Sequence, residues 1–395
     1  MRRHPSLVRL SATLAVAGAT ALALAPSASA RLLARAAYIP NDTGVASASG
    51  PAAGWHSVQW ALTGPFGINT PAAWTQVSSA GASGGRGVVV AVLDSGVAYA
   101  NRGRYRRSPD FSGTSFVRGH DFVDDDPYPN DEFGHGTFIT STIAATANNS
   151  YGTVGVAYRA RIMPVRVLDR DGRGFPRTIA RAIRYAVRRG ADVINLSLEL
   201  YDAPPKAPVP RSVTASRSVR EALAAARSAG VLVVSATGNS YDRRVPSARY
   251  DTLALNVGGT TEHGCLGNYS NHGPGMDVVA PGGGEDAALP GDPNCIPDGP
   301  SGRDIAAVSF PAGRPRSFEI VPRFRGTSTA APHVSGVAAL VIASRVLGRN
   351  PTPASIERHI ERTARDLGAP GRDGFYGAGL LDATAATAAA PTPSG

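Results

Sequence analysis

Short apolar runs rich in β-branched residues alternate with amphipathic stretches along most of this chain. Runs of about four to eight apolar residues between turn residues are typical of buried strands. Six such runs are Val88–Leu93, Arg161–Leu168, Asp192–Ser197, Val231–Ala236, Leu253–Val257 and Asp277–Ala280. Helical patterns lie between them, such as Thr178–Arg189, which is followed by Gly190, a common helix end. This alternation predicts an α/β fold, a three-layer architecture with a mostly parallel, twisted sheet and helices on both faces.

The two ends of the chain depart from this pattern. The first residues carry three arginines, then an apolar run to Ala25, then the small residues Ala28-Ser29-Ala30, which is the pattern of a secretory signal peptide. A membrane anchor is the alternative, but the apolar run is short for a bilayer. We therefore expect a signal peptide at 1–30, a short mobile N-terminal segment at 31–58, one folded domain at 59–385 and a disordered tail at 386–395.

The net charge of the chain and its distribution restrict the classes of partner that the protein could bind. The whole sequence has a net charge of +10, and removal of residues 1–30, with three arginines and no acidic residue, leaves 37 basic and 30 acidic residues, or +7. The arginines are dispersed and aromatic residues make up only 7%, whereas a nucleic-acid groove concentrates both. No later run reaches membrane-spanning length. We expect a secreted, extracellular monomer that binds neither nucleic acid nor, after signal removal, a membrane.

One serine stands where a nucleophile would be useful. The segment Gly326–His333 places Ser328 between a tight turn and the apolar run Val334–Ile342, which reads as a buried helix. Backbone N–H groups at a helix N-terminus are unpaired and favour negative charge, as an oxyanion formed during attack on a carbonyl requires. An ordinary serine cap before a core helix explains this segment equally well.

Three further polar residues occur at comparable places. Asp94 follows the strand-like run Val88–Leu93, at the edge where open α/β sheets place their sites. His135 lies in a glycine-flanked loop that opens an apolar helix, and Asn239 follows the run Val231–Ala236 after a glycine. Taken singly, Asn239 is as well explained by a turn, but four such residues in one order are a specific pattern.

Asp94, His135 and Ser328, in that order, together with Asn239, resemble the motifs of the subtilisin-like serine proteases, the subtilases or peptidase S8 family. The resemblance covers nearly all of residues 59–385 and implies a subtilisin-like catalytic domain. It implies a secreted serine endopeptidase of broad specificity that forms an acyl-enzyme on Ser328. His135 would be the general base and Asp94 its orienting partner, while Asn239 and the Ser328 N–H would bind the oxyanion.

Other activities remain open at this point. A processing protease with one polypeptide target would carry the same motifs, and a non-catalytic relative kept as a binding module is a further alternative. A lipase-type hydrolase would instead need a Gly-x-Ser-x-Gly elbow with the serine before its partners. The order here is the reverse.

The resemblance also implies where a polypeptide substrate binds. It assigns the walls of the pocket before the scissile bond to two segments: Leu196, Ser197 and Leu198, and Ala236, Thr237 and Gly238. The first of these would pair with the substrate backbone as an added strand. Without the resemblance, the apolar pattern of the first segment predicts only a buried strand.

Three positions depart from the family pattern. Thr329 stands where the family has methionine, which predicts resistance to peroxide because threonine forms no sulfoxide. Phe138 replaces a histidine and reads as a packing change. Glu199 replaces a glycine, and its carboxylate either favours basic substrate residues near the cleft or is a solvated surface group.

Calcium is the cofactor that the resemblance implies, in a structural role, at two loops. Carboxylate and carbonyl oxygens are the ligands Ca²⁺ prefers, although Asp-rich and Asn-rich loops are also ordinary turns. One loop resembles the calcium loop of thermitase-type relatives, with Asp121, Asp124, Asp126 and Asn130. The other resembles the tight subtilisin site, with the side chains of Asp110 and Asn149, the carbonyls of Ala147, Tyr151 and Thr153, and Gln59 as a weaker candidate.

The chain has two cysteines, Cys265 and Cys295. Export into an oxidising compartment predicts a disulfide between them. It would close a loop of about 30 residues and contribute roughly 3–4 kcal/mol. Two free thiols are the alternative.

Overall fold

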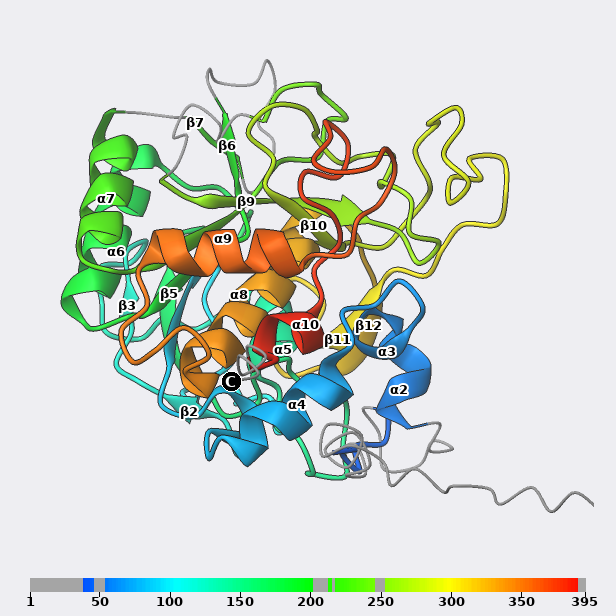
Figure 1. Cartoon of the computed structure of the whole chain (residues 1–395). Coiled ribbons are helices and arrows are strands. Elements are labelled where there is room, and N and C mark those ends of the chain that lie inside the picture. The colour runs from blue at the N-terminus through cyan, green and yellow to red at the C-terminus, as the bar shows by residue number, and fades with distance from the viewer. Residues whose placement is uncertain (1–37, 46–53, 202–211, 215–216, 246–252, 390–395) are drawn as a thin grey trace, which may run out of the picture. The chain divides into compact units, whose positions relative to one another are not determined.

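A parallel sheet forms the centre of the fold (Figure 1). The computed structural model describes residues 38–45, 54–201, 212–214, 217–245 and 253–389. The strands of the sheet are β1 Val89–Asp94, β2 Ser115–Phe116, β3 His120–Asp121, β4 Arg161–Arg166, β5 Val193–Leu196, β8 Leu232–Ala236, β9 Leu255–Thr260 and β10 Val278–Pro281. Their order is β10-β9-β8-β5-β1-β4-β2, with β3 also paired to β4, and all of these pairings are parallel. The predicted α/β class and all six predicted strands are confirmed.

Side-chain alternation along the central strand explains why both faces are covered. In β1, Val90 and Val92 enter one hydrophobic cluster, whereas Val89, Ala91 and Leu93 enter the other. Because successive side chains of a strand point to opposite faces, an all-apolar strand needs helices on each side.

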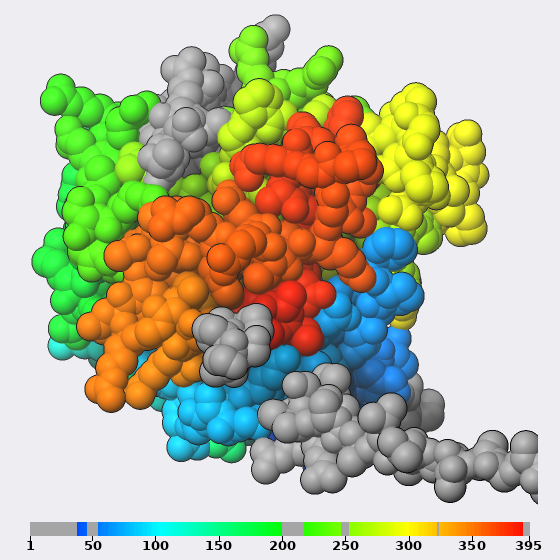
Figure 2. All heavy atoms as spheres, in the orientation of Figure 1, coloured from blue at the N-terminus to red at the C-terminus, as the bar shows by residue number. Residues whose placement is uncertain are grey.

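Helices supply those two layers (Figure 1). On one face, α6 Pro176–Arg188 and α7 Arg217–Ser228 contribute their apolar sides to the cluster around Leu93. On the other face lie α5 His135–Ala144 and α8 Thr327–Ser344, the latter buried from Thr327 to Val341. Figure 2 shows why α8 is so deeply buried, since atoms of α4 Thr70–Ser79, α9 Pro353–Thr363 and α10 Ala383–Thr387 form the surface on that side.

Smaller elements complete the described chain. The hairpin of β11 Ile305–Ser309 and β12 Glu319–Phe324 is antiparallel, and β6 Glu199–Tyr201 pairs with β7 Ser212–Thr214 in parallel. The remaining short helices are α2 Trp55–Val58, α3 Trp60–Thr63, η1 Ser83–Gly85 and η2 Pro109–Phe111. None of the helices in the described part of the chain is long and apolar enough to cross a membrane.

Residues 38–45, part of the segment at 31–58 that was expected to be mobile, make specific contacts with the rest of the chain. Their backbone is tied to the loop at 147–153: Gly44 N donates to Gly152 O (2.9 Å), and Gly152 N donates to Val45 O (2.9 Å). The Asp42 carboxylate accepts hydrogen bonds from the N–H groups of Asn148 and Asn149 at 2.8 and 3.2 Å. The predicted signal peptide at 1–30 lies outside the described residues.

The predicted tail boundary also needs correction. Ala386 and Thr387 belong to α10 and are buried, and Ala386 O accepts a hydrogen bond from His359 Nε2 at 2.8 Å. Alanine-rich sequence suggested fraying, but here the alanines pack on α4 and α9. Residues 390–395 lie outside the described part.

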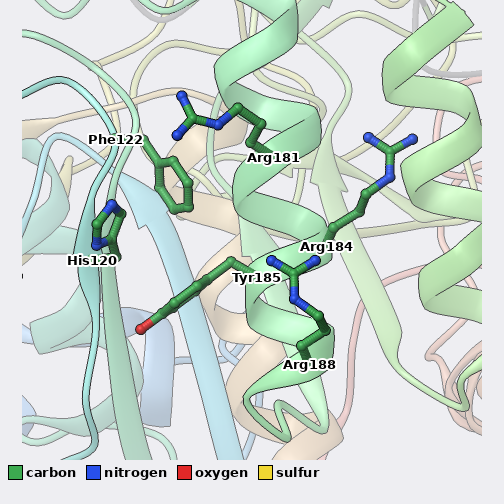
Figure 3. A pocket seen from close by; sticks show the side chains of 6 residues that line it. All are labelled: His120, Phe122, Arg181, Arg184, Tyr185 and Arg188. Carbon is green, nitrogen blue, oxygen red and sulfur yellow. The ribbon is translucent and has the colours of Figure 1, made fainter. Parts of the chain in front are cut away.

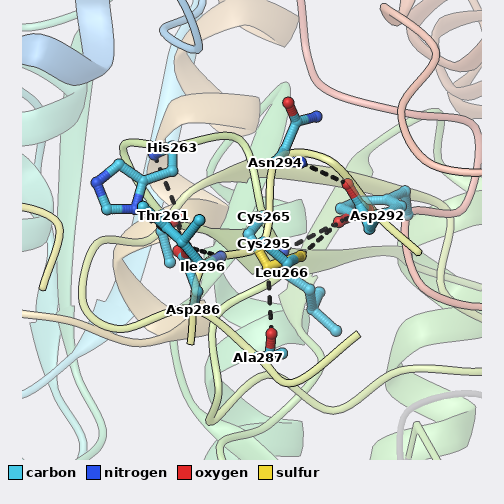
Figure 4. Close-up of a disulfide and its surroundings, with 11 residues drawn as sticks. Thr261, His263, Cys265, Leu266, Asp286, Ala287, Asp292, Asn294, Cys295 and Ile296 are labelled. Atoms are coloured by element: carbon cyan, nitrogen blue, oxygen red, sulfur yellow. Dashed lines mark hydrogen bonds and ion pairs between the residues drawn. A yellow bond between two sulfur atoms is a disulfide. The ribbon is translucent and has the colours of Figure 1, made fainter. Parts of the chain in front are cut away.

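The two cysteines form a disulfide (Figure 4), with an S–S distance of 2.00 Å. Beside it, the buried Asp286 carboxylate accepts hydrogen bonds from Thr261 Oγ1, His263 Nδ1 and Ile296 N. The disulfide therefore closes a loop that hydrogen bonds also hold. The bond itself was predicted from export into an oxidising compartment.

Candidate functional site

Two elements bring an aspartate and a histidine together. Asp94 is the last residue of β1, and His135 is the first residue of α5. The helix end comes this close because position 136 is glycine: a Cβ there would lie 2.1 Å from Gly96 O and 3.0 Å from Asp94 Cβ. Any larger residue would push His135 away from the sheet edge.

The three predicted reactive side chains form a continuous line of contacts. His135 Nδ1 lies 2.8 and 2.9 Å from the two carboxylate oxygens of Asp94, and His135 Nε2 lies 3.3 Å from Ser328 Oγ. Asp94 Oδ1 also accepts the N–H of Ser95 at 2.7 Å. Asp94 and His135 are fully buried and Ser328 is 3% exposed. The imidazole can therefore take the hydroxyl proton of Ser328 at Nε2 while the Asp94 carboxylate holds its Nδ1.

Ser328 lies in the first turn of α8, and a proline later in the helix helps to fix it. Pro332 has no N–H to give to the carbonyl four residues earlier, which is that of Ser328. The Ser197 hydroxyl donates to this carbonyl instead, at 2.7 Å. Ser197 Oγ in turn accepts from Asn195 Nδ2 at 2.8 Å, and Asn195 Oδ1 accepts from Ser335 Oγ at 2.8 Å. The sheet therefore holds the helix turn that carries Ser328.

Asn239 has a fixed orientation beside Ser328. Its Oδ1 accepts hydrogen bonds from Thr327 N at 2.8 Å and from Thr327 Oγ1 at 3.2 Å. Its Nδ2 donates to a carboxylate oxygen of Glu199. Gly326 has a φ of 138°, and a Cβ there would lie 3.0 Å from Asn239 Oδ1 and 3.5 Å from Ser328 Oγ, so only glycine leaves this approach open.

A buried aspartate supports the histidine and was missed by the sequence argument. Asp131 accepts hydrogen bonds from Ser95 Oγ, the N–H groups of Phe133 and Gly134, and both the N–H and hydroxyl of Thr137. Burial raises its pKa to about 6, and these bonds oppose that shift. The sequence feature that could have identified Asp131 is its position four residues before His135. A single acidic residue in a loop is, however, typical of a turn.

The two predicted substrate walls flank the start of α8. All six residues are buried: Leu196, Ser197, Leu198, Ala236, Thr237 and Gly238. Gly238 N donates to Thr327 Oγ1 at 3.1 Å, and Thr237 Oγ1 donates to Asn271 O at 3.1 Å. Gly238 is thus held at the start of α8, as Ser197 is by its bond to the carbonyl of Ser328.

The three departures from the expected motif have clear places. Phe138 is fully buried and packs on Phe324 with ring centroids 4.3 Å apart, as a packing change predicts. Thr329 Oγ1 donates to the carbonyls of Gly326 and Gly282 at 2.8 and 3.1 Å. Glu199 is only 6% exposed, and the reading of a solvated surface carboxylate is therefore wrong.

Comparison with known proteins agrees with this arrangement. The model of the subtilase family matches residues 85–379, which include Asp94, His135, Asn239 and Ser328. This chain belongs to the subtilase family. It is a serine endopeptidase by that membership, and its mostly parallel sheet is the subtilisin-like α/β fold.

Named relatives cover most of this subtilase. Subtilisin BL of Lederbergia lenta is 35% identical over 309 residues, which are 77% of this chain and 91% of that protein. M-protease of Shouchella clausii is 33% identical over 356 residues, 89% of this chain and 73% of that protein. A solved protease structure from Pseudoalteromonas arctica has a TM-score of 0.65 and 29% identity over 89% of this chain and 99% of that one.

The first predicted calcium loop of this subtilase does not suit a metal ion. The Arg166 guanidinium, 4% exposed, lies among the carboxylates: its Nη1 is 2.8 Å from Asp121 Oδ2 and 2.6 Å from Asp124 Oδ2, and its Nη2 is 3.2 Å from Glu132 Oε2. Asp121 Oδ1 is used by the N–H groups of Val123 and Asp124. An internal cation thus already binds carboxylates that a metal ion would need.

The other two residues predicted for that site are turn residues. Asp126 Oδ1 accepts the N–H of Tyr128 at 2.7 Å, and Asn130 Nδ2 donates to Tyr128 O at 3.3 Å. These contacts do not favour the thermitase-type calcium assignment, which stays a prediction. The sequence motif could not reveal this, because Arg166 lies 40 residues further along in β4.

The second predicted loop suits a cation better. The Asp110 carboxylate is fully buried, accepts the N–H and hydroxyl of Thr153 at 3.1 and 2.7 Å, and lies 3.4 Å from Asn149 Nδ2. Burial raises its pKa to about 8, and the Asp42 carboxylate acts in the same direction. Two buried acids share this place, and oxygen-rich, negatively charged surroundings are what Ca²⁺ requires.

Two observations limit the number of side chains that could bind a cation at this second loop. Gln59 is not a ligand, because both ends of its amide bind the backbone of Val154, at 2.9 and 2.8 Å. The described residues hold no cluster of three or more histidine, cysteine, aspartate or glutamate side chains placed to bind a metal. Any cation here would rely on main-chain and amide oxygens beside Asp110.

A hollow elsewhere on the described surface does not involve the site. It lies between α6 and the loop after β3 and is lined by His120, Phe122, Tyr185 and three arginines of α6, Arg181, Arg184 and Arg188 (Figure 3). Arg181 pairs with Asp125 and Arg184 with Glu221. Two of its three arginines therefore take part in ion pairs on the surface of the molecule.

Proposed function

We propose that this subtilase is a secreted endopeptidase that hydrolyses polypeptides through an Asp94–His135–Ser328 triad and an acyl-enzyme on Ser328. The observation that carries the proposal is the line of contacts from the Asp94 carboxylate through His135 to Ser328 Oγ, with Asn239 alongside. It rests equally on the family membership and on the relatives named subtilisin and alkaline protease.

The chemistry follows from the properties of each group. A serine hydroxyl attacks a carbonyl only when a base takes its proton, and the Nε2 of His135 is 3.3 Å from Ser328 Oγ. His135 then returns this proton to the leaving amine, and later takes a proton from the water that attacks the acyl-enzyme. Asp94 keeps the Nδ1 proton in place and stabilises the imidazolium without becoming protonated.

The charge on the tetrahedral intermediate needs donors of its own. Asn239 Nδ2 and the N–H of Ser328 at the start of α8 are the groups that would bind the oxyanion. Thr327 matters because its two hydrogen bonds to Asn239 Oδ1 fix the orientation of the amide, so that Nδ2 is its donor end. The positive end of the α8 dipole adds to the same effect.

Substrate binding and calcium complete the proposal. The substrate backbone would lie along 196–198, with the side chain before the scissile bond between that segment and 236–238, and specificity would be broad. Ca²⁺ would be structural, held by Asp110, Asn149 and the carbonyls of Ala147, Tyr151 and Thr153. The activity would be exerted outside the cell by a monomer, after removal of residues 1–30.

A comparison of wild type with Ser328→Ala tests the proposal. Both secreted proteins are treated with a fluorophosphonate probe and then given casein in the presence of calcium. We expect labelling and digestion in wild type alone. Folded wild type that takes no label would favour a non-catalytic binding module, and labelling without digestion would favour a processing protease or an esterase.

A further inference from the structure

Glu199 occupies an unusual place for a carboxylate. It is the first residue of β6, directly after the 196–198 segment, and its side chain is 6% exposed. One of its carboxylate oxygens accepts a hydrogen bond from Asn239 Nδ2. Its charge is therefore held beside the amide that would bind the oxyanion.

The same carboxylate lies across the gap between the two proposed walls. A Cβ at Gly238 would lie 3.8 Å from Glu199 Cδ, so the carboxylate group lies against the 236–238 segment while its backbone continues the 196–198 segment. Gly238 has a φ of 106° and carries no side chain that would separate them. Glu199 thus faces the place where the side chain before the scissile bond would enter.

This placement has an electrostatic consequence. Negative charge developing on the substrate carbonyl oxygen would be repelled by a carboxylate that shares its amide donor. A cationic substrate side chain at the same place would offset that repulsion and gain a charge-assisted hydrogen bond.

We propose that Glu199 makes this subtilase cleave preferentially after arginine or lysine, by binding the cationic side chain of the residue whose carbonyl is attacked. The inference rests on the proposed function and narrows its substrate class at one position. Arginine is favoured over lysine, since its planar guanidinium can bind both carboxylate oxygens.

The test compares two peptide p-nitroanilides that are identical except for arginine or citrulline before the scissile bond. Citrulline keeps the length and shape of arginine but lacks its charge. We expect kcat/KM to be at least tenfold higher for arginine in wild type, and the ratio to fall about tenfold or more in Glu199→Gln. The matched control is Glu221→Gln on α7, which pairs with Arg217 at the surface and should keep the wild-type ratio.

The outcomes separate this inference from the proposed function. A wild-type ratio near one, or an unchanged ratio in Glu199→Gln, would overturn the inference and leave the endopeptidase intact. Equal loss on both substrates in Glu199→Gln would also overturn it, since Glu199 would then only position Asn239. If wild type hydrolysed neither peptide and took no fluorophosphonate label, the proposed function itself would fall. A wild-type ratio near one would overturn the inference even if the variant does not fold.

Discussion

At the scale of single residues, the site depends on side chains that hold other side chains. Ser197 holds the carbonyl of Ser328, Thr327 holds the amide of Asn239, and Asp131 holds the loop before His135. Each of these is a short polar group that is itself buried. Because a proton transfer tolerates little displacement, such supports are as necessary as the reacting groups.

Replacement of Asn239 by alanine should slow the chemical step while leaving substrate binding nearly unchanged. Loss of one oxyanion donor typically lowers kcat by about 10²–10³-fold. Steady-state kinetics on a peptide anilide would measure kcat and KM separately. The exposed amide Asn268, which binds Glu285, provides a matched control as Asn268→Ala. A rise in KM at unchanged kcat would contradict the assigned role.

At the scale of elements, Arg166 at the end of β4 supplies a positive charge to the acidic loop that follows β3, about 40 residues earlier in the chain. Arg166 holds Asp121, Asp124 and Glu132 together, and with them the chain that leads from β3 toward α5. The Arg166 guanidinium supplies positive charge to these carboxylates. Because it is part of the chain, this charge does not depend on the calcium concentration. The loop is therefore fixed by strand pairing as well as by charge.

Removal of this cation should destabilise the fold. Arg166→Met leaves the buried Asp121 without its partner, and breaking a buried pair typically costs about 3–5 kcal/mol. Denaturant unfolding in a Ser328→Ala background, which prevents self-digestion, would measure the loss. Arg173→Met, an exposed arginine 3.8 Å from Asp171, should change the free energy of unfolding by less than about 0.5 kcal/mol. Comparable losses in both variants would argue against a special role for Arg166.

Helix α8 carries a buried histidine that should make the fold sensitive to acid. Burial lowers the pKa of His333 from 6.5 to about 4, while its Nδ1 donates to Thr329 O at 2.9 Å. The unfolded chain therefore binds this proton more tightly than the folded one. Its contribution to stability is complete above pH 6.5 and is lost as the pH falls toward 4, by up to about 3 kcal/mol.

Urea unfolding at pH 7 and pH 4.5 would measure this effect in the Ser328→Ala background. His333→Gln should lose less stability on acidification than the parent, because glutamine does not titrate. The exposed His56, changed to glutamine, should leave the pH dependence unaltered. An equal acid response in parent and His333→Gln would show that other groups set it.

At the scale of the whole molecule, two distant parts of the chain depend on one loop. The segment 38–45 and the residues around Asp110 both bind the loop at 147–153, which follows α5. Both bring a buried carboxylate, Asp42 and Asp110, to it. Calcium there would join the start of the described chain to the layer that carries His135.

Removal of calcium should therefore lower the melting temperature of the Ser328→Ala protein, since a ligand that binds only the folded state stabilises it. Asp110→Asn should abolish this response, and without calcium it should be at least as stable as its parent because it removes a carboxyl group whose ionisation is disfavoured by burial. Scanning calorimetry with calcium and with chelator would measure both. Asp126→Asn, a turn residue in the other loop, should keep the calcium response. A chelator that changes neither protein would refute the site.

The local sequence determined a large part of this protein. Buried parallel strands and core helices show themselves by short-range apolar patterns, so the six strands and the α/β class were predictable. The positions of Asp94, His135, Asn239 and Ser328 at element ends were also readable, because the ends of strands and helices are marked by glycines and polar residues.

Only the tertiary structure decided which charges meet. Arg166 lies among acids that are distant in sequence, Glu199 turns toward Asn239 rather than to solvent, and residues 38–45 bind a loop over 100 residues away. No periodicity encodes such contacts, since they arise from strand order and from how the helices bury the chain. The same reason separates the two calcium loops: one meets an arginine of the neighbouring strand β4, and the other meets a second carboxylate.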